Sequence, residues 1–169
     1  MRAAYRDMPV RQRRGFPHAP PTATAPLSAT PPIRLIRHSP LVLRLRLRLG
    51  ALQGLLDGHS FWAVGRSRGD LARMLGGSRA VVSAWQGQEL VGFGRATSDG
   101  VFRAVLWDVV VVAPLQGRGL GSRIVEALLN HRGVAAAERV YLMTTNSAGF
   151  YQRLGFEEDH GQRLLLRSR

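Results

Sequence analysis

The chain of 169 residues contains no cysteine and no lysine. The absence of cysteine excludes disulfide bonds, thiolate metal sites and an acyl-cysteine intermediate. The absence of lysine excludes the phosphate-binding loop GxxxxGK(S/T), because the lysine of that loop contacts the phosphates. No apolar run approaches the roughly 20 residues of a membrane-spanning helix, so we expect a soluble protein with no membrane partner.

Acidic residues are scarce in the first third of the chain, and this sets much of the net charge of +13. Residues 1–56 hold ten arginines and one aspartate, whereas residues 57–169 hold fourteen arginines and ten acidic residues. The use of arginine alone is typical of a GC-rich genome. We therefore expect no nucleic-acid partner, and a basic nucleic-acid-binding module is kept only as a distant alternative function.

Residues 1–40 are rich in proline, alanine, threonine and arginine and show neither a helical nor a strand period. Such a segment buries too little apolar surface to fold. The sequence predicts a disordered or transit-like extension over residues 1–40 and one folded domain over residues 41–169. An arginine-rich, acid-poor transit peptide would place the protein in a plastid, which is the alternative to the expected bacterial cytoplasm.

The folded part carries strand and helix patterns in turn. Residues 41–49 end in LRLRLRL, a strict alternation that predicts a half-buried strand. Short helices are predicted at 51–57 and 70–75, the second with Asp70 as N-cap and Gly76 and Gly77 as its end. Residues 80–85 and 89–97 predict a hairpin. Further strands are predicted at 103–112, 140–144 and 163–167, and further helices at 120–129 and 147–154. Together these elements predict a mixed α/β sheet of the α+β class.

The most informative stretch follows the strand at residues 103–112. Gly117, Gly119 and Gly121 alternate with larger residues, so several backbone amides can point toward one ligand. An amphipathic helix begins directly afterwards, and the N-terminus of a helix attracts phosphate. A dinucleotide-binding GxGxxG is excluded, because Ser122 stands where the third glycine would be. The stretch predicts a loop that binds another phosphate ligand.

Two motifs in the second half of the chain carry a family resemblance. QGRGLG at residues 116–121 and NSAGFYQRLGF at residues 146–156 stand about 30 residues apart. The first resembles the pyrophosphate-binding pattern (Arg/Gln)-x-x-Gly-x-(Gly/Ala) of the GCN5-related N-acetyltransferases, the GNAT family, and the second resembles that family's FYxxLGF motif. The resemblance covers residues 41–169. Within the family, residues 90–108 resemble the plastid and cyanobacterial branch typified by serotonin N-acetyltransferase.

The resemblance implies the GNAT fold, a mixed and mostly antiparallel sheet flanked by helices, with a bulge that splays the fourth strand from the fifth. It implies acetyl-CoA as co-substrate and no metal. The pantetheine arm would pair with the backbone of Val109, Val110, Val111 and Val112. The pyrophosphate would rest on Gln116, Gly117, Arg118, Gly119, Leu120, Gly121 and Ser122. The second motif would add Asn146, Phe150 and Tyr151 to the cofactor site.

Two residues are predicted to act in catalysis. The resemblance implies that Tyr151 is the general acid, because a phenol with a reference pKa of about 10 can donate a proton to the leaving thiolate of coenzyme A. Asp108 could accept a proton from the amine through water or attract an ammonium group. A carboxylate buried on such a strand must be hydrogen-bonded in any case, so a structural role for Asp108 is the alternative.

The branch resemblance implies direct acetyl transfer to a primary amine, with an arylalkylamine such as serotonin as the first expectation. The alternative function keeps the fold and makes the acceptor a protein, at a lysine side chain or an N-terminal amine. Phe61 and Trp62 fall in the region that shapes the acceptor site in this family, so they are candidate walls for a flat amine. Many members of the family pair through their C-terminal strands, so a homodimer is a further expectation.

Overall fold

The computed structural model describes residues 30–38 and 48–167, and residues from Pro31 onward belong to one unit. The sheet of this unit has five strands in the order β1-β2-β3-β4-β5. Their bounds are Ile33–His38, Ala80–Gln86, Glu89–Ser98, Arg103–Val111 and Arg139–Tyr141. The first three pairings are antiparallel, and β4 pairs with β5 in parallel. The predicted mixed, mostly antiparallel sheet is confirmed.

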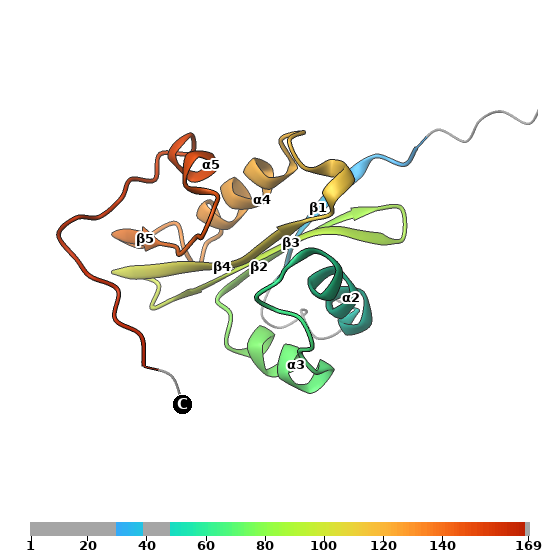
Figure 1. Ribbon diagram of the computed structural model, residues 1–169, viewed down its shortest axis with the longest axis horizontal. Coiled ribbons are helices and arrows are strands. Elements are labelled where there is room, and N and C mark those ends of the chain that lie inside the picture. Colours follow the sequence, from blue (N-terminus) through green and yellow to red (C-terminus); the bar gives the residue numbers. More distant parts are fainter. Residues whose placement is uncertain (1–29, 39–47, 168–169) are drawn as a thin grey trace, which may run out of the picture. The chain divides into compact units, whose positions relative to one another are not determined.

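Helices cover both faces of this sheet. Helices α2 (Leu49–His59) and α3 (Arg68–Gly76) lie on one face, and α4 (Leu120–Leu129) lies on the other (Figure 1). A short 3-10 helix, η1 (Ala113–Leu115), joins β4 to the loop before α4, and α5 (Ala148–Gln152) follows β5. Each face has its own apolar cluster, one around Phe93 and the other around Ile124. Among the described helices, none combines the length and hydropathy needed to cross a bilayer.

The first strand lies earlier in the chain than the sequence patterns indicate. Strand β1 pairs along its whole length with β2, from Ile33 opposite Gln86 to His38 opposite Val81. The prediction that residues 1–40 hold no strand is therefore wrong for β1, whose six residues are too short to show a clear period between prolines. Most of the predicted strand at residues 41–49 lies outside the described residues, and its last residue, Leu49, begins α2.

The two helices of the first face are close to their predicted positions, but the cap of α3 differs. Ser67, not Asp70, is the N-cap: its Oγ accepts a hydrogen bond from the Asp70 backbone N–H at 3.1 Å and donates one to Asp70 Oδ2 at 2.6 Å. Asp70 is thus the third residue of the helix, and its carboxylate binds the hydroxyl of the Ser67 cap. The predicted end at Gly76 and Gly77 is confirmed.

The hairpin of β2 and β3 turns at Gln86-Gly87-Gln88 as predicted, with Gly87 at a φ of 58°.

The prediction of a strand at residues 163–167 is wrong. Residues 163–167 form no strand, and Leu164, Leu165 and Leu166 are 77%, 88% and 89% exposed. Three consecutive leucines do not alternate, so they give no face that a half-buried strand could turn to the core.

Helix α4 packs so closely on β3 that a Cβ at either of two glycines would crowd its side chains. A Cβ at Gly92 would lie 2.8 Å from Ile124 Cδ1, and a Cβ at Gly94 would lie 2.8 Å from Ile124 Cγ2 and 3.0 Å from Leu128 Cδ1. Glycine in a strand interior often marks such a close approach. The contact fixes the depth of α4 on the sheet and therefore the position of the loop at its N-terminus.

The bulge implied by the family resemblance lies inside β4. Between the register pairs of Phe93 and Arg95, two residues of β4, Asp108 and Val109, oppose Gly94 alone. Asp108 has a φ of 51°, in the left-handed region that aspartate adopts more readily than most residues. A bulge turns a side chain away from the regular alternation of the strand. Here it redirects the carboxylate of Asp108.

Strands β4 and β5 separate soon after they meet. Their parallel register runs from Arg103 opposite Arg139 to Val105 opposite Tyr141 and then ends. Strand β5 is also shorter than the predicted residues 140–144, and the chain continues without strand structure from Leu142. This confirms the predicted splayed pair, which leaves one backbone edge of β4 without a strand partner among the described residues.

Candidate active site

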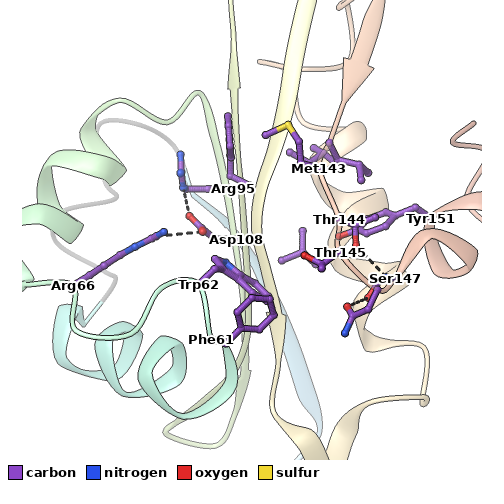
Figure 2. Close-up of a pocket in the computed structure, with 15 residues that line it drawn as sticks. Phe61, Trp62, Arg66, Arg95, Asp108, Met143, Thr144, Thr145, Ser147 and Tyr151 are labelled. Atoms are coloured by element: carbon purple, nitrogen blue, oxygen red, sulfur yellow. Dashed lines mark hydrogen bonds and ion pairs between the residues drawn. The ribbon is translucent and has the colours of Figure 1, made fainter. Parts of the chain in front are cut away.

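A cavity of about 500 Å³ opens where β4 and β5 part. One wall comes from β4 and from residues near α3, and the opposite wall comes from the segment after β5 and from α5. Figure 2 shows these two groups facing each other, with Asp108 and two arginines on one side and Thr144, Ser147 and Tyr151 on the other. The structure therefore brings the two predicted catalytic residues, Asp108 and Tyr151, to a single cavity.

Tyr151 lies on α5, held by neighbouring aromatic rings. Its ring packs edge-on against Phe150 at a centroid distance of 4.8 Å and against Phe156 at 5.8 Å. Burial raises the pKa of the Tyr151 hydroxyl above its usual value, so the phenol stays protonated through the neutral range. Its hydroxyl makes no hydrogen bond to the described residues, which leaves the proton available to a ligand in the cavity.

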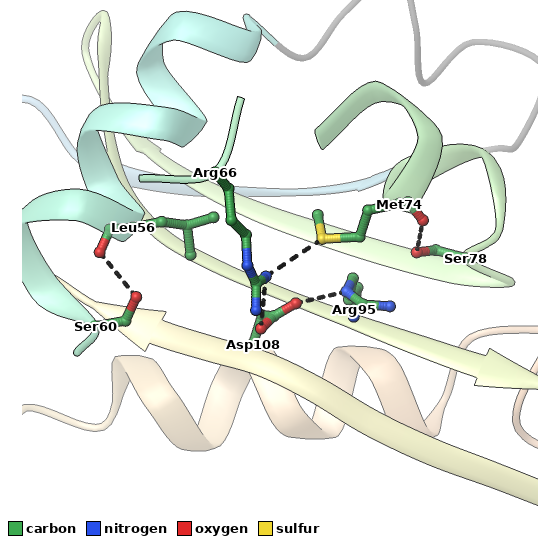
Figure 3. Close-up of polar contacts among 7 residues, drawn as sticks. All are labelled: Leu56, Ser60, Arg66, Met74, Ser78, Arg95 and Asp108. Atoms are coloured by element: carbon green, nitrogen blue, oxygen red, sulfur yellow. Dashed lines mark hydrogen bonds and ion pairs between the residues drawn. The ribbon is translucent and has the colours of Figure 1, made fainter. Parts of the chain in front are cut away.

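Asp108 lies between two arginines from different elements (Figure 3). Its Oδ1 accepts a hydrogen bond from Arg66 Nη1 at 3.2 Å, and its Oδ2 accepts one from Arg95 Nε at 2.6 Å. The Asp108 side chain is only 4% exposed. Both carboxylate oxygens are thus bound by guanidinium groups, which favours the predicted structural role of Asp108 over the role of proton acceptor.

Arg66 and Arg95 are held by more than the carboxylate. Arg66 Nη1 also lies 3.6 Å from Met74 Sδ, on α3. The Arg95 guanidinium stacks over the Trp107 ring at 5.6 Å from its centroid, a cation–π contact. Local sequence links neither arginine to Asp108, because Arg66 is 42 residues and Arg95 is 13 residues away from it. Their presence could have been inferred because a buried carboxylate such as that of Asp108 needs a cationic or hydrogen-bonding partner.

The predicted aromatic wall also lines the cavity. Phe61 and Trp62 follow α2 and pack edge-on with ring centroids 5.0 Å apart. They are 71% and 49% exposed. Their accessible rings at the cavity suit an apolar part of a ligand.

The glycine-rich loop has the geometry of an anion-binding turn. Gly117 and Gly119 have φ values of 71° and 79°, and Gly119 is the N-cap of α4. Other residues adopt these angles only with strain. The first amides of α4 have no acceptor within the helix, so they and the positive end of the helix dipole can face a phosphate. The exposed Arg118 side chain lies in the same turn.

The backbone edge predicted to hold the pantetheine arm is shorter than expected. The Val112 N–H donates to the Val91 carbonyl at 3.0 Å, and the Val112 carbonyl accepts from Leu115 N–H at 3.0 Å. Both polar groups of Val112 are therefore used within the chain. The Val111 carbonyl accepts from Gln116 Nε2 at 2.9 Å, which ties the loop to the strand. Val109, Val110 and the N–H of Val111 remain as the candidate edge.

The two sequence motifs meet in space. A Cβ on Gly121, in the first turn of α4, would lie 3.3 Å from the ring of Phe150 on α5. Asn146 lines the cavity, and its Oδ1 accepts a hydrogen bond from the Ser147 hydroxyl at 3.3 Å. Ser147 is the N-cap of α5. The motif residues thus join the loop to the cavity.

The described residues contain no cluster of histidine and carboxylate side chains suited to a metal.

Comparisons with known proteins agree with this geometry. A family model described as "Acetyltransferase (GNAT) domain" matches residues 77–158. "Serotonin N-acetyltransferase 2, chloroplastic" from Oryza sativa subsp. japonica is 44% identical over 70 residues, which are 41% of this chain and 35% of the relative. "Histone acetyltransferase TAP1" from Glycine max is 38% identical over 73 residues, which are 43% of this chain and 32% of the relative. The matches span about a third of each relative's length.

The solved structures agree in fold. A GNAT family acetyltransferase from Streptococcus pneumoniae TIGR4 superposes with a TM-score of 0.62 at 24% identity, covering 80% of this chain and 99% of that one. The superposition includes nearly the whole of the bacterial protein. The chain therefore shares the overall fold of this bacterial protein.

Proposed function

Since the chain carries an acetyltransferase domain of the GNAT family, we propose that it transfers an acetyl group from acetyl-CoA directly to a primary amine. The observation that carries the proposal is the continuity of the site. The glycine-rich loop suits the pyrophosphate, the free edge of β4 suits the pantetheine arm, and the cavity with Tyr151 lies where that edge ends.

In the proposed reaction one bond forms, one bond breaks and two protons are transferred. The neutral amine nitrogen attacks the thioester carbonyl carbon, a C–N bond forms, and the C–S bond breaks. A backbone N–H of Val109 to Val111 stabilises the developing oxyanion. The Tyr151 hydroxyl gives its proton to the leaving thiolate, and the proton lost by the amine restores the phenol through water. The products are an N-acetylated amine and free coenzyme A, and no acyl-enzyme is formed.

For the acceptor, we propose an amine with an aromatic part, and serotonin is the first compound to test. The exposed pair of Phe61 and Trp62 at the cavity supports this choice, as does the name of the rice relative. A protein amine is the alternative, supported by the name of the soybean relative and by the exposed residues 143–146 at the cavity rim.

The experiment that tests the function is the release of free thiol from acetyl-CoA by the full chain. Serotonin, tryptamine, spermidine and a lysine-bearing peptide serve as acceptors, and mass spectrometry identifies each product. Turnover of the indole amines supports the first acceptor class, and turnover of the peptide alone replaces it with the second. If acetyl-CoA binds but no free thiol is released with any of these acceptors or with tryptophan, acetyl transfer to amines is contradicted.

Location and assembly are separate proposals. The rice relative is named chloroplastic, which supports a plastid, whereas the lysine-free composition supports a bacterial cytoplasm. Import of a fusion to residues 1–40 by isolated chloroplasts distinguishes the two. A homodimer remains a proposal, and light scattering of the purified chain measures its mass.

A further inference from the structure

The cavity wall that faces Tyr151 carries an excess of positive charge. Arg66 and Arg95 are the two basic residues that line the cavity, and Asp108 is the one acidic residue that does so, all within the described part of the chain. One carboxylate offsets one guanidinium. The lining therefore carries a net charge of about +1, since arginine stays protonated in proteins.

The arginines also keep hydrogen-bond donors for a ligand. A guanidinium has five N–H groups, of which Arg95 uses its Nε–H on Asp108 and Arg66 uses Nη1 on Asp108 and Met74. The terminal amino groups of Arg95 make no hydrogen bond to the described residues. Asp108 holds both guanidinium groups at the cavity and so fixes them in advance of binding (Figures 2 and 3).

This charge does not suit an amine that carries only an ammonium group. A cation that enters a partly buried site of like charge loses hydration and gains repulsion. An acceptor that also carries a carboxylate removes both penalties, because a guanidinium binds a carboxylate through paired N–H donors. The aromatic pair of Phe61 and Trp62 supplies the apolar surface for the remainder of the molecule.

We infer that the acceptor is an amine bearing a carboxylate beside an aromatic group, in the chemical class of the aromatic α-amino acids, and that Arg66 and Arg95 select it. The inference rests on the proposed acetyl transfer and narrows its acceptor. It assigns to the two arginines a specificity role that the sequence motifs do not contain.

Matched pairs of acceptors test the inference without any mutation. Tryptophan and tryptamine, 5-hydroxytryptophan and serotonin, and phenylalanine and phenethylamine differ only by the carboxylate. The expected result is a kcat/KM about tenfold or more higher for the carboxylate-bearing member of each pair. Equal values, or a preference for the plain amines, would overturn the inference and leave acetyl transfer itself standing.

A binding measurement separates this inference from the proposed function. Calorimetry with N-acetyltryptophan and N-acetyltryptamine, in the presence of coenzyme A, measures the charge preference without turnover. Tighter binding of the carboxylate compound with no turnover of any amine would retain the charge selection and contradict the function. Equal binding would contradict the charge selection whatever the turnover.

The variant Arg66→Gln tests whether Arg66 is responsible for the preference for carboxylate-bearing acceptors. We expect the KM for tryptophan to rise about tenfold and the KM for tryptamine to stay the same or fall. Arg68→Gln is the matched control, because Arg68 lies two residues away, bonds to Gln53 and does not line the cavity. Thermal melting confirms that both variants fold. An Arg66→Gln enzyme that keeps its preference for tryptophan would remove Arg66 from the selection.

Discussion

At the scale of single residues, Tyr151 has the clearest assigned task. Its phenol is protonated at neutral pH and faces the cavity. We expect Tyr151→Phe to lower kcat about 100-fold, because general acid catalysis typically contributes that much or more, with little change in the KM for acetyl-CoA. Tyr141→Phe is the control, since Tyr141 is on β5 and outside the cavity lining. Steady-state thiol release measures both variants, and a similar loss in each would contradict the assignment.

Asp108 is expected to matter first for stability. Asn keeps its shape and tolerates the left-handed backbone, so Asp108→Asn removes only the charge that pairs two arginines. We expect the free energy of unfolding to fall by about 2–3 kcal/mol, less than for a fully buried pair because Arg66 is 32% exposed.

The control for Asp108→Asn is Glu138→Gln, which breaks the exposed ion pair with Arg103 at 3.2 Å. A surface pair of this kind contributes at most about 1 kcal/mol. Urea unfolding followed by circular dichroism compares the two variants. If Asp108→Asn were as stable as the wild type while kcat fell sharply, the role of proton acceptor would return.

The place of Tyr151 at the cavity and the glycine-rich turn before α4 could be predicted from the sequence, because both depend on short local motifs. Arg66 and Arg95 could not, because their meeting at Asp108 depends on the bulge that redirects the carboxylate. A register shift of this kind is set by pairing between strands rather than by local sequence.

At the scale of elements, the contact between α4 and β3 sets the position of the glycine-rich loop. Gly94→Ala places a methyl group 2.8 Å from Ile124 Cγ2, so the Ile124 side chain, and α4 with it, is expected to shift. We expect a loss of about 1–3 kcal/mol of stability from overpacking and a rise in the KM for acetyl-CoA, since the loop begins α4. Chemical unfolding and initial-rate kinetics measure the two effects.

Gly54→Ala provides the comparison for this change. Gly54 is exposed on α2 and has no heavy atom within 4 Å of an added Cβ, so alanine should raise stability by about 0.5–1 kcal/mol. Loss of stability in both variants, or an unchanged KM in Gly94→Ala, would mean that α4 can adjust without moving the loop.

The elements that local pattern predicts well are the hairpin, β4 and α4, because each has a long period or a turn with its own chemistry. The errors fall at the two ends of the domain. Strand β1 is defined by its pairing with β2, and the leucines at 164–166 have no strand partner among the described residues. Edge strands depend on neighbours that are distant in sequence, so their own residues predict them poorly.

At the scale of the whole molecule, one buried histidine should make stability depend on pH. His131 follows α4 and is 7% exposed. Burial lowers the pKa of its imidazole, a hydrogen bond to the His38 backbone opposes this, and three nearby arginines, Arg37, Arg79 and Arg132, add to the lowering. The folded state therefore favours the neutral ring.

The sign of the effect follows from this lowered pKa. As the pH falls below the unfolded value of about 6.5, the unfolded chain binds a proton before the folded one does. Stability should thus fall on acidification from pH 7.5 to pH 5.5 and depend less on this group above pH 7. Urea midpoints at the two values measure it, and His131→Gln should show a smaller decrease. An identical decrease in the variant would assign the effect to other groups.

Strand β1 has a practical consequence for truncated forms of the protein. A recombinant chain that begins at residue 41 lacks β1, so the outer backbone groups of β2 and its buried Val81 and Val82 would become an open sheet edge. Such edges pair with other chains and promote aggregation. A chain that begins at Pro31 should remain monodisperse in gel filtration at concentrations where the shorter one precipitates.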